Sequence, residues 1–224
     1  MTPREGTLAR LPRPRAILFD WDNTLVDSWP TIHEALNFCM SAMGKPCWSL
    51  EQTKERVRLS LRDSFPHHFG DRWEEARTVY LGRFREIHLE RLTALPDRET
   101  MLHGLVGEGI FLGVVSNKTG ALLRREVERL GWCDLFGSVV GAGDASADKP
   151  ACEPILLALA SSGIRPGEDV WYVGDTAIDI ECACKTGCVS VLLGVDAQAA
   201  EFVQCPSHLA FPDAQSLFRG VRDL

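Results

Sequence analysis

Three aspartates lie close together in the stretch FDWDNTLVDS, which spans residues 19–28. Asp20 and Asp22 are separated only by Trp21, and Asp27 follows in the same stretch. Like charges at this spacing repel one another, and a hard dication such as Mg²⁺, which takes oxygen ligands, would offset that repulsion. Taken alone, the two aspartates could equally begin a turn, because Asp favours turns.

Other polar side chains stand at comparable places in the chain. Most of them follow a short apolar run, and one precedes a predicted helix. Ligands of open α/β sheets gather at the carboxyl ends of the strands, so we expect these residues to meet Asp20 and Asp22 at one edge of a sheet. That expectation makes the turn interpretation unlikely. The residues are Ser116, Asn117, Lys149, Asp175 and Asp179.

Five short apolar runs are predicted to be the strands that position these residues. They lack the alternation of apolar and polar residues that marks a half-exposed strand, so both of their faces should be buried. Burial on both faces is typical of a parallel sheet between layers of helices. The runs are Ala16–Phe19, Phe111–Val115, Ser138–Val140, Val170–Val173 and Val189–Leu193.

Helical patterns lie between the later runs. We predict helices over Thr119–Leu130, ended by Gly131, over Pro154–Ser162, and over Ile178–Thr186, ended by Gly187. Alternating strands and helices of this kind predict an α/β fold, a Rossmann-like doubly wound parallel sheet.

Residues 29–95 break this alternation and contain no strand-like run. Apolar residues at helical spacing predict two long helices, over 32–43 and 73–87, with Asp71 placed to cap the second. A weaker pattern predicts a helix over Leu50–Asp63. The segment is therefore predicted to be an all-helical insert. The predicted organisation is a loose tail over 1–14, a core of 15–28 and 96–224, and the insert over 29–95.

The composition limits the classes of function. The 224 residues are 45% apolar and carry a net charge of −7, with no massed basic residues, so a sizeable core is available and a nucleic-acid surface is not indicated. No apolar run approaches the roughly 20 residues that span a bilayer, and the start of the chain resembles no signal peptide. The eight cysteines are predicted to be reduced. We therefore expect a cytoplasmic monomer or homodimer without a membrane or nucleic-acid partner.

Together these motifs resemble the haloacid dehalogenase superfamily of phosphotransferases. Its first motif, D-x-D-G-T-L-x-D-S, is matched by residues 20–28, and its second, a strand ending in Ser or Thr, by Ser116. The third motif, a lysine, is matched by Lys149, and the fourth, G-D-x-x-x-D, by residues 174–179. All four occur in the family's order between residue 15 and about 200, and the helical insert matches the cap of many members. The pattern is most similar to the phosphoglycolate phosphatase-like enzymes.

The resemblance implies a Mg²⁺-dependent phosphatase that hydrolyses a small phosphorylated metabolite, with phosphoglycolate as the default substrate. Asp20 would attack the phosphorus and become an aspartyl-phosphate, which divides one hard step into two easier ones. Asp22 would give a proton to the leaving oxygen and later take one from the hydrolytic water.

The resemblance also implies roles for the remaining motif residues. The metal ligands would be Asp20, Asp175 and the backbone carbonyl of Asp22. Asp179 would orient a metal-bound water or Lys149, with direct ligation left open. The phosphoryl group would be held by Ser116, the backbone N–H of Asn117 and Lys149.

Two alternatives remain open. A phosphomutase of the β-phosphoglucomutase type would keep both aspartates and the cap. A non-catalytic phosphate-binding relative would be expected to have lost a motif residue, and none is missing here. A dehalogenase is disfavoured, because it does not need Asp22.

Several residues around the motifs are given structural interpretations. Asn23 replaces the family's usual Gly and should adopt the positive φ that Asn tolerates. Asp27 and Ser28 fit a helix start before Pro30. Lys118 is interpreted as a surface charge at the start of the helix predicted over Thr119–Leu130. Asn117 could cap the same helix.

Cysteines and histidines elsewhere are not predicted to bind a metal. Cys182, Cys184 and Cys188 lack the usual spacing of a zinc site and are expected to be small buried hydrophobic residues. His67 and His68 follow Pro66 and are expected to lie in a polar loop of the insert.

Overall fold

The computed structural model describes residues 8, 10–57, 61–203 and 205–224. The chain divides into two compact units, one formed by Met1–Leu25 with Ala94–Leu224 and the other by Val26–Thr93. We call the first the core unit and the second the helical unit. The predicted insert, 29–95, overlaps the helical unit.

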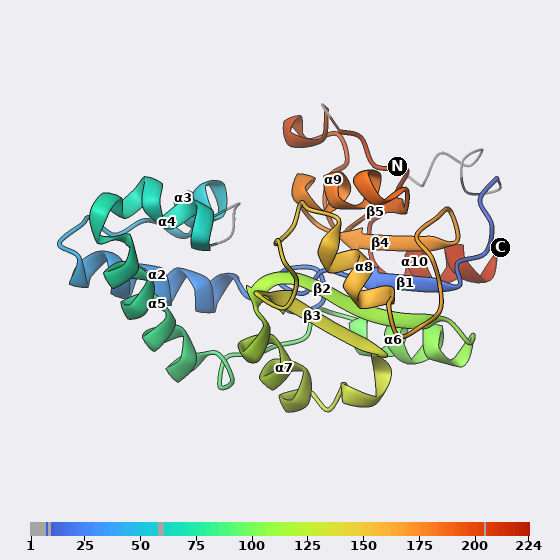
Figure 1. The fold of residues 1–224 in the computed structure, drawn as a ribbon, viewed down its shortest axis with the longest axis horizontal. Coiled ribbons are helices and arrows are strands. Elements are labelled where there is room, and N and C mark those ends of the chain that lie inside the picture. The colour runs from blue at the N-terminus through green and yellow to red at the C-terminus, as the bar shows by residue number, and fades with distance from the viewer. Residues whose placement is uncertain (1–7, 9, 58–60, 204) are drawn as a thin grey trace. The chain divides into compact units, whose positions relative to one another are not determined.

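Six parallel strands form the sheet of the core unit, in the order β3-β2-β1-β4-β5-β6 (Figure 1). The prediction of a doubly wound parallel sheet is therefore confirmed. Two of the predicted runs have the observed limits, three are extended at the carboxyl end, and the last strand was not predicted. The strands are β1 (Ala16–Phe19), β2 (Phe111–Thr119), β3 (Ser138–Ala142), β4 (Val170–Gly174), β5 (Val189–Leu193) and β6 (Leu209–Phe211).

The register of the central strands aligns their carboxyl ends. Phe19, the last residue of β1, lies opposite Val114 on one side and Val173 on the other. Every residue of β1, β4 and β5 is buried, as the almost continuous apolar runs predict. The polar residues that follow β1 and β4 therefore begin at the same edge of the sheet.

Helices cover the sheet of the core unit (Figure 1). α7 packs against β2 and β3, and α9 packs against β4 and β5. α9 ends at Gly187, whose φ of 74° is the left-handed conformation that Gly adopts at helix ends. The helices are α6 (Arg98–Gly107), α7 (Gly120–Arg129), α8 (Glu153–Leu159), α9 (Ala177–Thr186) and α10 (Ala214–Arg222), with short 3₁₀ turns η2 (Cys133–Leu135) and η3 (Ala200–Phe202).

Part of the predicted tail packs on the core unit. Pro14 is buried, and Arg13 forms an ion pair with Glu108. Residues 1–7 and 9 of the predicted tail lie outside the described part of the chain.

The helical unit contains two long helices that pack on each other, α2 (Trp29–Ala42) and α5 (Trp73–Ile87). α2 begins after Ser28, as predicted, and the carboxylate of Asp27 accepts a hydrogen bond from the Trp29 N–H at 3.3 Å. The unit is completed by α3 (Leu50–Arg56), α4 (Leu61–Phe69) and the 3₁₀ turn η1 (Gly70–Arg72).

Three expectations for the helical unit need correction. α3 ends at Arg56 rather than at residue 63, and residues 58–60 of the predicted helix are not described. Asp71 lies within η1, so it does not cap α5. His67 and His68 lie in α4 and not in a loop. Aromatic packing accounts for the helix continuing past Pro66, since the ring of Phe65 lies 5.0 Å from that of Phe69 and 5.5 Å from that of Tyr80.

Across the described residues, no helix combines the length and the apolar composition that crossing a bilayer requires.

Candidate active site

The predicted nucleophile and the predicted lysine meet at the carboxyl end of β1. The ammonium group of Lys149 donates hydrogen bonds to Asp20 Oδ1 and Asp179 Oδ1, both at 2.7 Å. All three side chains are buried. Residues that are 129 positions apart in the sequence are therefore joined by one buried ion pair, in agreement with the expectation that they meet at one edge of the sheet.

Asp20, Asp175 and Asp179 form a compact acidic cluster. One carboxylate oxygen from each lies within 4.8 Å of the others. Hard divalent cations prefer oxygen ligands in such an arrangement, so the cluster fits Mg²⁺. The side chain of Asp22 is not part of this group, and its predicted contribution to the metal was its backbone carbonyl.

The electrostatics of the cluster also favour a cation. Burial raises the pKa of Asp20 to about 7, an effect that the Lys149 ammonium opposes and the Asp179 carboxylate reinforces. Burial and the neighbouring Asp20 and Asp179 charges raise the pKa of Asp175 well above its ordinary value. One lysine does not neutralise three carboxylates, so a divalent cation would relieve the remaining repulsion.

Asp179 is held by hydrogen bonds on both of its oxygens. Oδ2 accepts from the N–H and the hydroxyl of Thr176 at 3.0 and 2.7 Å, which forms a capping box at the start of α9. Oδ1 accepts from Lys149 and lies 3.2 Å from the Tyr172 hydroxyl, which also lies 2.8 Å from the Val115 carbonyl oxygen and shares its single proton between the two acceptors. Gly174 makes room for this carboxylate, because a Cβ there would lie 2.3 Å from Asp179 Cγ. These contacts occupy the oxygens of Asp179 and favour a role in orienting Lys149.

Two further residues that the sequence analysis did not single out support the loop after β1. The Thr24 hydroxyl donates to Asp175 Oδ1 at 2.9 Å, and the Thr24 carbonyl accepts from buried Arg98 Nε at 2.8 Å. Asn23 has a φ of 64°, so the predicted left-handed conformation is confirmed. Because Thr24 belongs to the first motif, its position in that motif was the sequence signal that could have identified it as a supporting residue.

Ser116 and Asn117 lie where β2 passes this edge. Buried Ser116 accepts a hydrogen bond from the Lys118 N–H at 3.2 Å. The Asn117 side chain pairs with the Lys149 backbone, donating to its carbonyl at 3.1 Å and accepting from its N–H at 2.9 Å. The suggestion that Asn117 caps the next helix is therefore wrong, because its amide positions Lys149 instead.

Lys118 is not the surface charge that the sequence suggested. Only 6% of its side chain is exposed, and its ammonium lies 2.6 Å from both Asp22 Oδ1 and Glu126 Oε2. Burial by itself would lower the pKa of Lys118, but the two carboxylates raise it above its ordinary value. The prediction failed because Glu126, the partner that draws Lys118 inward, lies on the buried face of α7.

The three cysteines in and after α9 differ in burial. Cys182 and Cys188 are buried, as predicted, whereas Cys184 is exposed. Within the described part of the chain, the acidic cluster is the one group of three or more ligand atoms close enough to share an ion.

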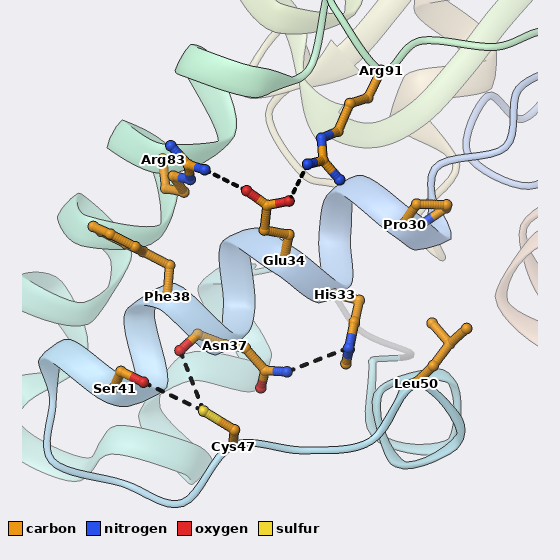
Figure 2. Close-up of a pocket in the computed structure, with 10 residues that line it drawn as sticks. All are labelled: Pro30, His33, Glu34, Asn37, Phe38, Ser41, Cys47, Leu50, Arg83 and Arg91. Atoms are coloured by element: carbon orange, nitrogen blue, oxygen red, sulfur yellow. Dashed lines mark hydrogen bonds and ion pairs between the residues drawn. The ribbon is translucent and has the colours of Figure 1, made fainter.

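The helical unit carries a separate pocket of about 670 Å³ between α2, α3 and α5 (Figure 2). Figure 2 shows the Glu34 carboxylate between the guanidinium groups of Arg83 and Arg91, with which it forms ion pairs. The wall is otherwise largely apolar, and Phe38 is 52% exposed. None of the predicted site residues lines this pocket.

Known proteins resemble the chain over most of its length. Residues 17–193 match the family described as haloacid dehalogenase-like hydrolase. A phosphoglycolate phosphatase of Xanthomonas campestris pv. campestris is 32% identical over 182 residues, which covers 80% of this chain and 82% of the relative. A phosphoglycolate phosphatase of Salmonella typhimurium is 26% identical, covering 81% and 82%.

Solved structures share the fold. A superfamily hydrolase from Ehrlichia chaffeensis aligns with a TM-score of 0.66 at 27% identity, covering 96% of this chain and 98% of that chain. A predicted phosphoglycolate phosphatase from Haemophilus somnus aligns with a TM-score of 0.81 at 20% identity, covering 93% and 98%, and at that identity it speaks for the fold alone.

Proposed function

The chain belongs to the haloacid dehalogenase-like hydrolase family, and from that membership we propose that it is a Mg²⁺-dependent phosphatase of small phosphomonoesters, with phosphoglycolate as the first substrate to test. The observation that carries the proposal is the meeting of Asp20, Lys149, Asp175 and Asp179 at one buried edge of the sheet. The names of the relatives support the choice of substrate class.

In the first step, a carboxylate oxygen of Asp20 attacks the phosphorus, and the bond between phosphorus and the leaving oxygen breaks. Lys149, whose ammonium already contacts Asp20, neutralises charge on the transferred group. The Ser116 hydroxyl and the Asn117 N–H hold a phosphoryl oxygen. Fixed charges and donors in a buried site stabilise the transition state more strongly than they would in water.

Asp22 acts as the general acid in the first step and as the general base in the second. It gives a proton to the departing alkoxide when the aspartyl-phosphate forms. It then takes a proton from the water that attacks the phosphorus, and the Asp20 carboxylate and inorganic phosphate are released. Its side chain is apart from the acidic cluster and 23% exposed, which suits a group that meets both substrate and water.

The side chains of Asp20 and Asp175, with the backbone carbonyl of Asp22, would hold Mg²⁺. When bound, the ion neutralises phosphoryl charge and keeps Asp20 ionised as a nucleophile. Thr24 holds Asp175 in place, and Asp179 orients Lys149.

The proposal is tested by measuring phosphate release from phosphoglycolate, p-nitrophenyl phosphate and a hexose 1-phosphate, with Mg²⁺ and with EDTA. We expect Mg²⁺-dependent release from the first two. Isomerisation of the hexose 1-phosphate to the 6-phosphate would indicate a phosphomutase instead. Binding of phosphate esters without release from any of them would indicate a non-catalytic relative.

The raised carboxylate pKa values predict how pH affects the stability of the metal-free protein. The pKa of Asp20 rises from 3.8 to about 7 on folding, so the folded state binds more protons than the unfolded state between these values. Stability in EDTA should therefore fall as the pH rises through this window. Bound Mg²⁺ should reverse the loss, so the gain in Tm on adding Mg²⁺ should be larger near pH 8 than near pH 5.

Thermal unfolding in EDTA and in Mg²⁺ at the two pH values checks this expectation. Asp175→Asn is the informative variant, because it should show little Mg²⁺-dependent gain at either pH. An equal gain at both pH values, or an undiminished gain in Asp175→Asn, would contradict the assignment of the metal to this cluster.

A further inference from the structure

A second buried ionic cluster lies beside the acidic one. Trp21, the residue between the two motif aspartates, donates its indole N–H to Glu126 Oε2 at 2.6 Å. Lys118 donates to the same oxygen at 2.6 Å, and its ammonium also lies 2.6 Å from Asp22 Oδ1. A continuous chain of contacts therefore runs from Trp21 through Glu126 and Lys118 to Asp22.

The fold holds this chain of contacts rigidly. Glu126 lies on the buried face of α7, next to Leu122 and Leu123, and only 1% of its side chain is exposed. Trp21 is fully buried and packs edge-on against Trp132, with 5.8 Å between ring centroids. Neither anchor can move without disturbing the packing of the core unit.

Burying two charges here needs an explanation beyond stability. A buried ion pair often contributes no more than apolar side chains of the same volume, and Glu126 stands on a helix face that is otherwise apolar. The pair does, however, aim an ammonium group at Asp22, the proposed acid and base, which lies outside the acidic cluster. What the arrangement adds is a defined position for the Asp22 carboxylate.

We propose that Lys118 is a positioning residue that, anchored by Glu126 and Trp21, holds the Asp22 carboxylate on the leaving-group side of the site and away from the acidic cluster. The inference rests on the proposed function, because Asp22 is the acid and base of that reaction. Without the ammonium of Lys118, the Asp22 carboxylate loses the ion pair that helps to fix its orientation, and fewer enzyme molecules have its carboxyl group where the leaving oxygen emerges. Proton transfer depends steeply on such placement.

The test compares two leaving groups in Lys118→Met, which keeps the length of the side chain and removes its charge. An alkyl phosphomonoester needs a proton on its leaving oxygen, whereas p-nitrophenolate leaves readily without one. We expect kcat for the alkyl ester to fall by about 10- to 100-fold with little change in KM. The rate of the p-nitrophenolate burst, which reports formation of the aspartyl-phosphate alone, should fall much less. Lys118→Arg, which keeps the charge, should recover part of the lost activity.

A double-mutant comparison separates positioning from a merely structural role. In the Asp22→Asn background, Lys118→Met should cause no further loss, because the group that it positions is already absent. Equal losses in kcat for the alkyl ester and in the p-nitrophenolate burst rate, or a full additional loss in the Asp22→Asn background, would overturn the inference. Lys185→Met is a matched control, since Lys185 also lies 2.6 Å from a glutamate, Glu181, but on the exposed surface of α9.

Lys118→Met leaves the buried carboxylate of Glu126 without its ammonium counter-ion and can fail to fold for that reason. The variant Lys118→Met/Glu126→Gln removes both charges and keeps an acceptor for Trp21, and it should show the same dependence on leaving group. If wild type and Asp22→Asn behave alike on alkyl esters, the proposed function is at fault. If Asp22→Asn is impaired and the Lys118 variants are not, only the present inference fails.

Discussion

Replacing Asp20 by Asn should reduce phosphate release by roughly 10⁴-fold or more, on every substrate that the wild type hydrolyses. The amide cannot attack phosphorus as a carboxylate does, and Asp179, the other carboxylate that contacts the Lys149 ammonium, already accepts hydrogen bonds from Thr176. Initial rates at saturating Mg²⁺ measure the effect.

The same substitution should leave the protein folded. The Asp20 carboxylate is buried and repelled by Asp179 and Asp22, so a neutral amide of nearly the same shape relieves repulsion while Lys149 keeps Asp179 as its partner. We expect the Tm in EDTA to be no lower than that of the wild type. Asp134→Asn, which changes an exposed aspartate of the core unit, is the control and should be fully active. A folded Asp20→Asn protein with wild-type rates would refute the nucleophile assignment.

Replacing Asp22 by Asn should lower kcat for alkyl phosphomonoesters by about 10²- to 10⁴-fold, the usual contribution of a general acid and base. Formation of the aspartyl-phosphate from p-nitrophenyl phosphate should be much less affected, because that leaving group needs no proton. Its breakdown should still be slow, because the water has lost its base. A burst of p-nitrophenolate followed by slow turnover, recorded by stopped flow, is the expected signature.

Asp144→Asn is the matched control for Asp22→Asn. The Asp144 side chain is 26% exposed and lies 2.6 Å from Arg124, much as Asp22 is 23% exposed and lies 2.6 Å from Lys118. The control should retain wild-type rates and show no burst. If formation and breakdown of the aspartyl-phosphate were slowed equally in Asp22→Asn, so that no burst appeared, the assignment of Asp22 as the acid and base would be wrong.

Most of the sheet could be predicted because its central strands are buried on both faces. The run Ala16–Phe19 has no polar interruption, and its limits agree with those of the observed strand β1. β6 was not predicted, because its three residues, Leu209–Phe211, are too few to form a recognisable strand pattern. α6 carries Gly104 and Gly107, which weaken a helical pattern, although the ring of Phe218 packs where a Cβ of residue 104 would lie. Whether such elements form depends on contacts with residues that are distant in the sequence, and a local sequence pattern does not contain that information.

The motif residues of the candidate site could be found from the sequence because most of them follow apolar runs and all of them occur in the family's order. Their supports could not be found in the same way. Tyr172 is apolar by pattern within β4, and only the fold brings its hydroxyl to Asp179. The sequence suggests that Lys118 is a solvent-exposed charge. Only the packing of α7 shows that Lys118 forms a buried ion pair with Glu126. Partners distant in sequence determine what these side chains do.

The central claim is that Asp20 carries the phosphoryl group during turnover, and chemical trapping tests it most directly. Asp22→Asn, in which the intermediate should accumulate, is mixed with p-nitrophenyl phosphate and Mg²⁺, quenched and reduced with borohydride, which converts an acyl phosphate to an alcohol. The account predicts homoserine in place of Asp20 by peptide mass spectrometry. Two results would contradict the account. One is reduction at a carboxylate other than Asp20, and the other is the absence of any reduced carboxylate in enzyme that has already released its burst of p-nitrophenolate.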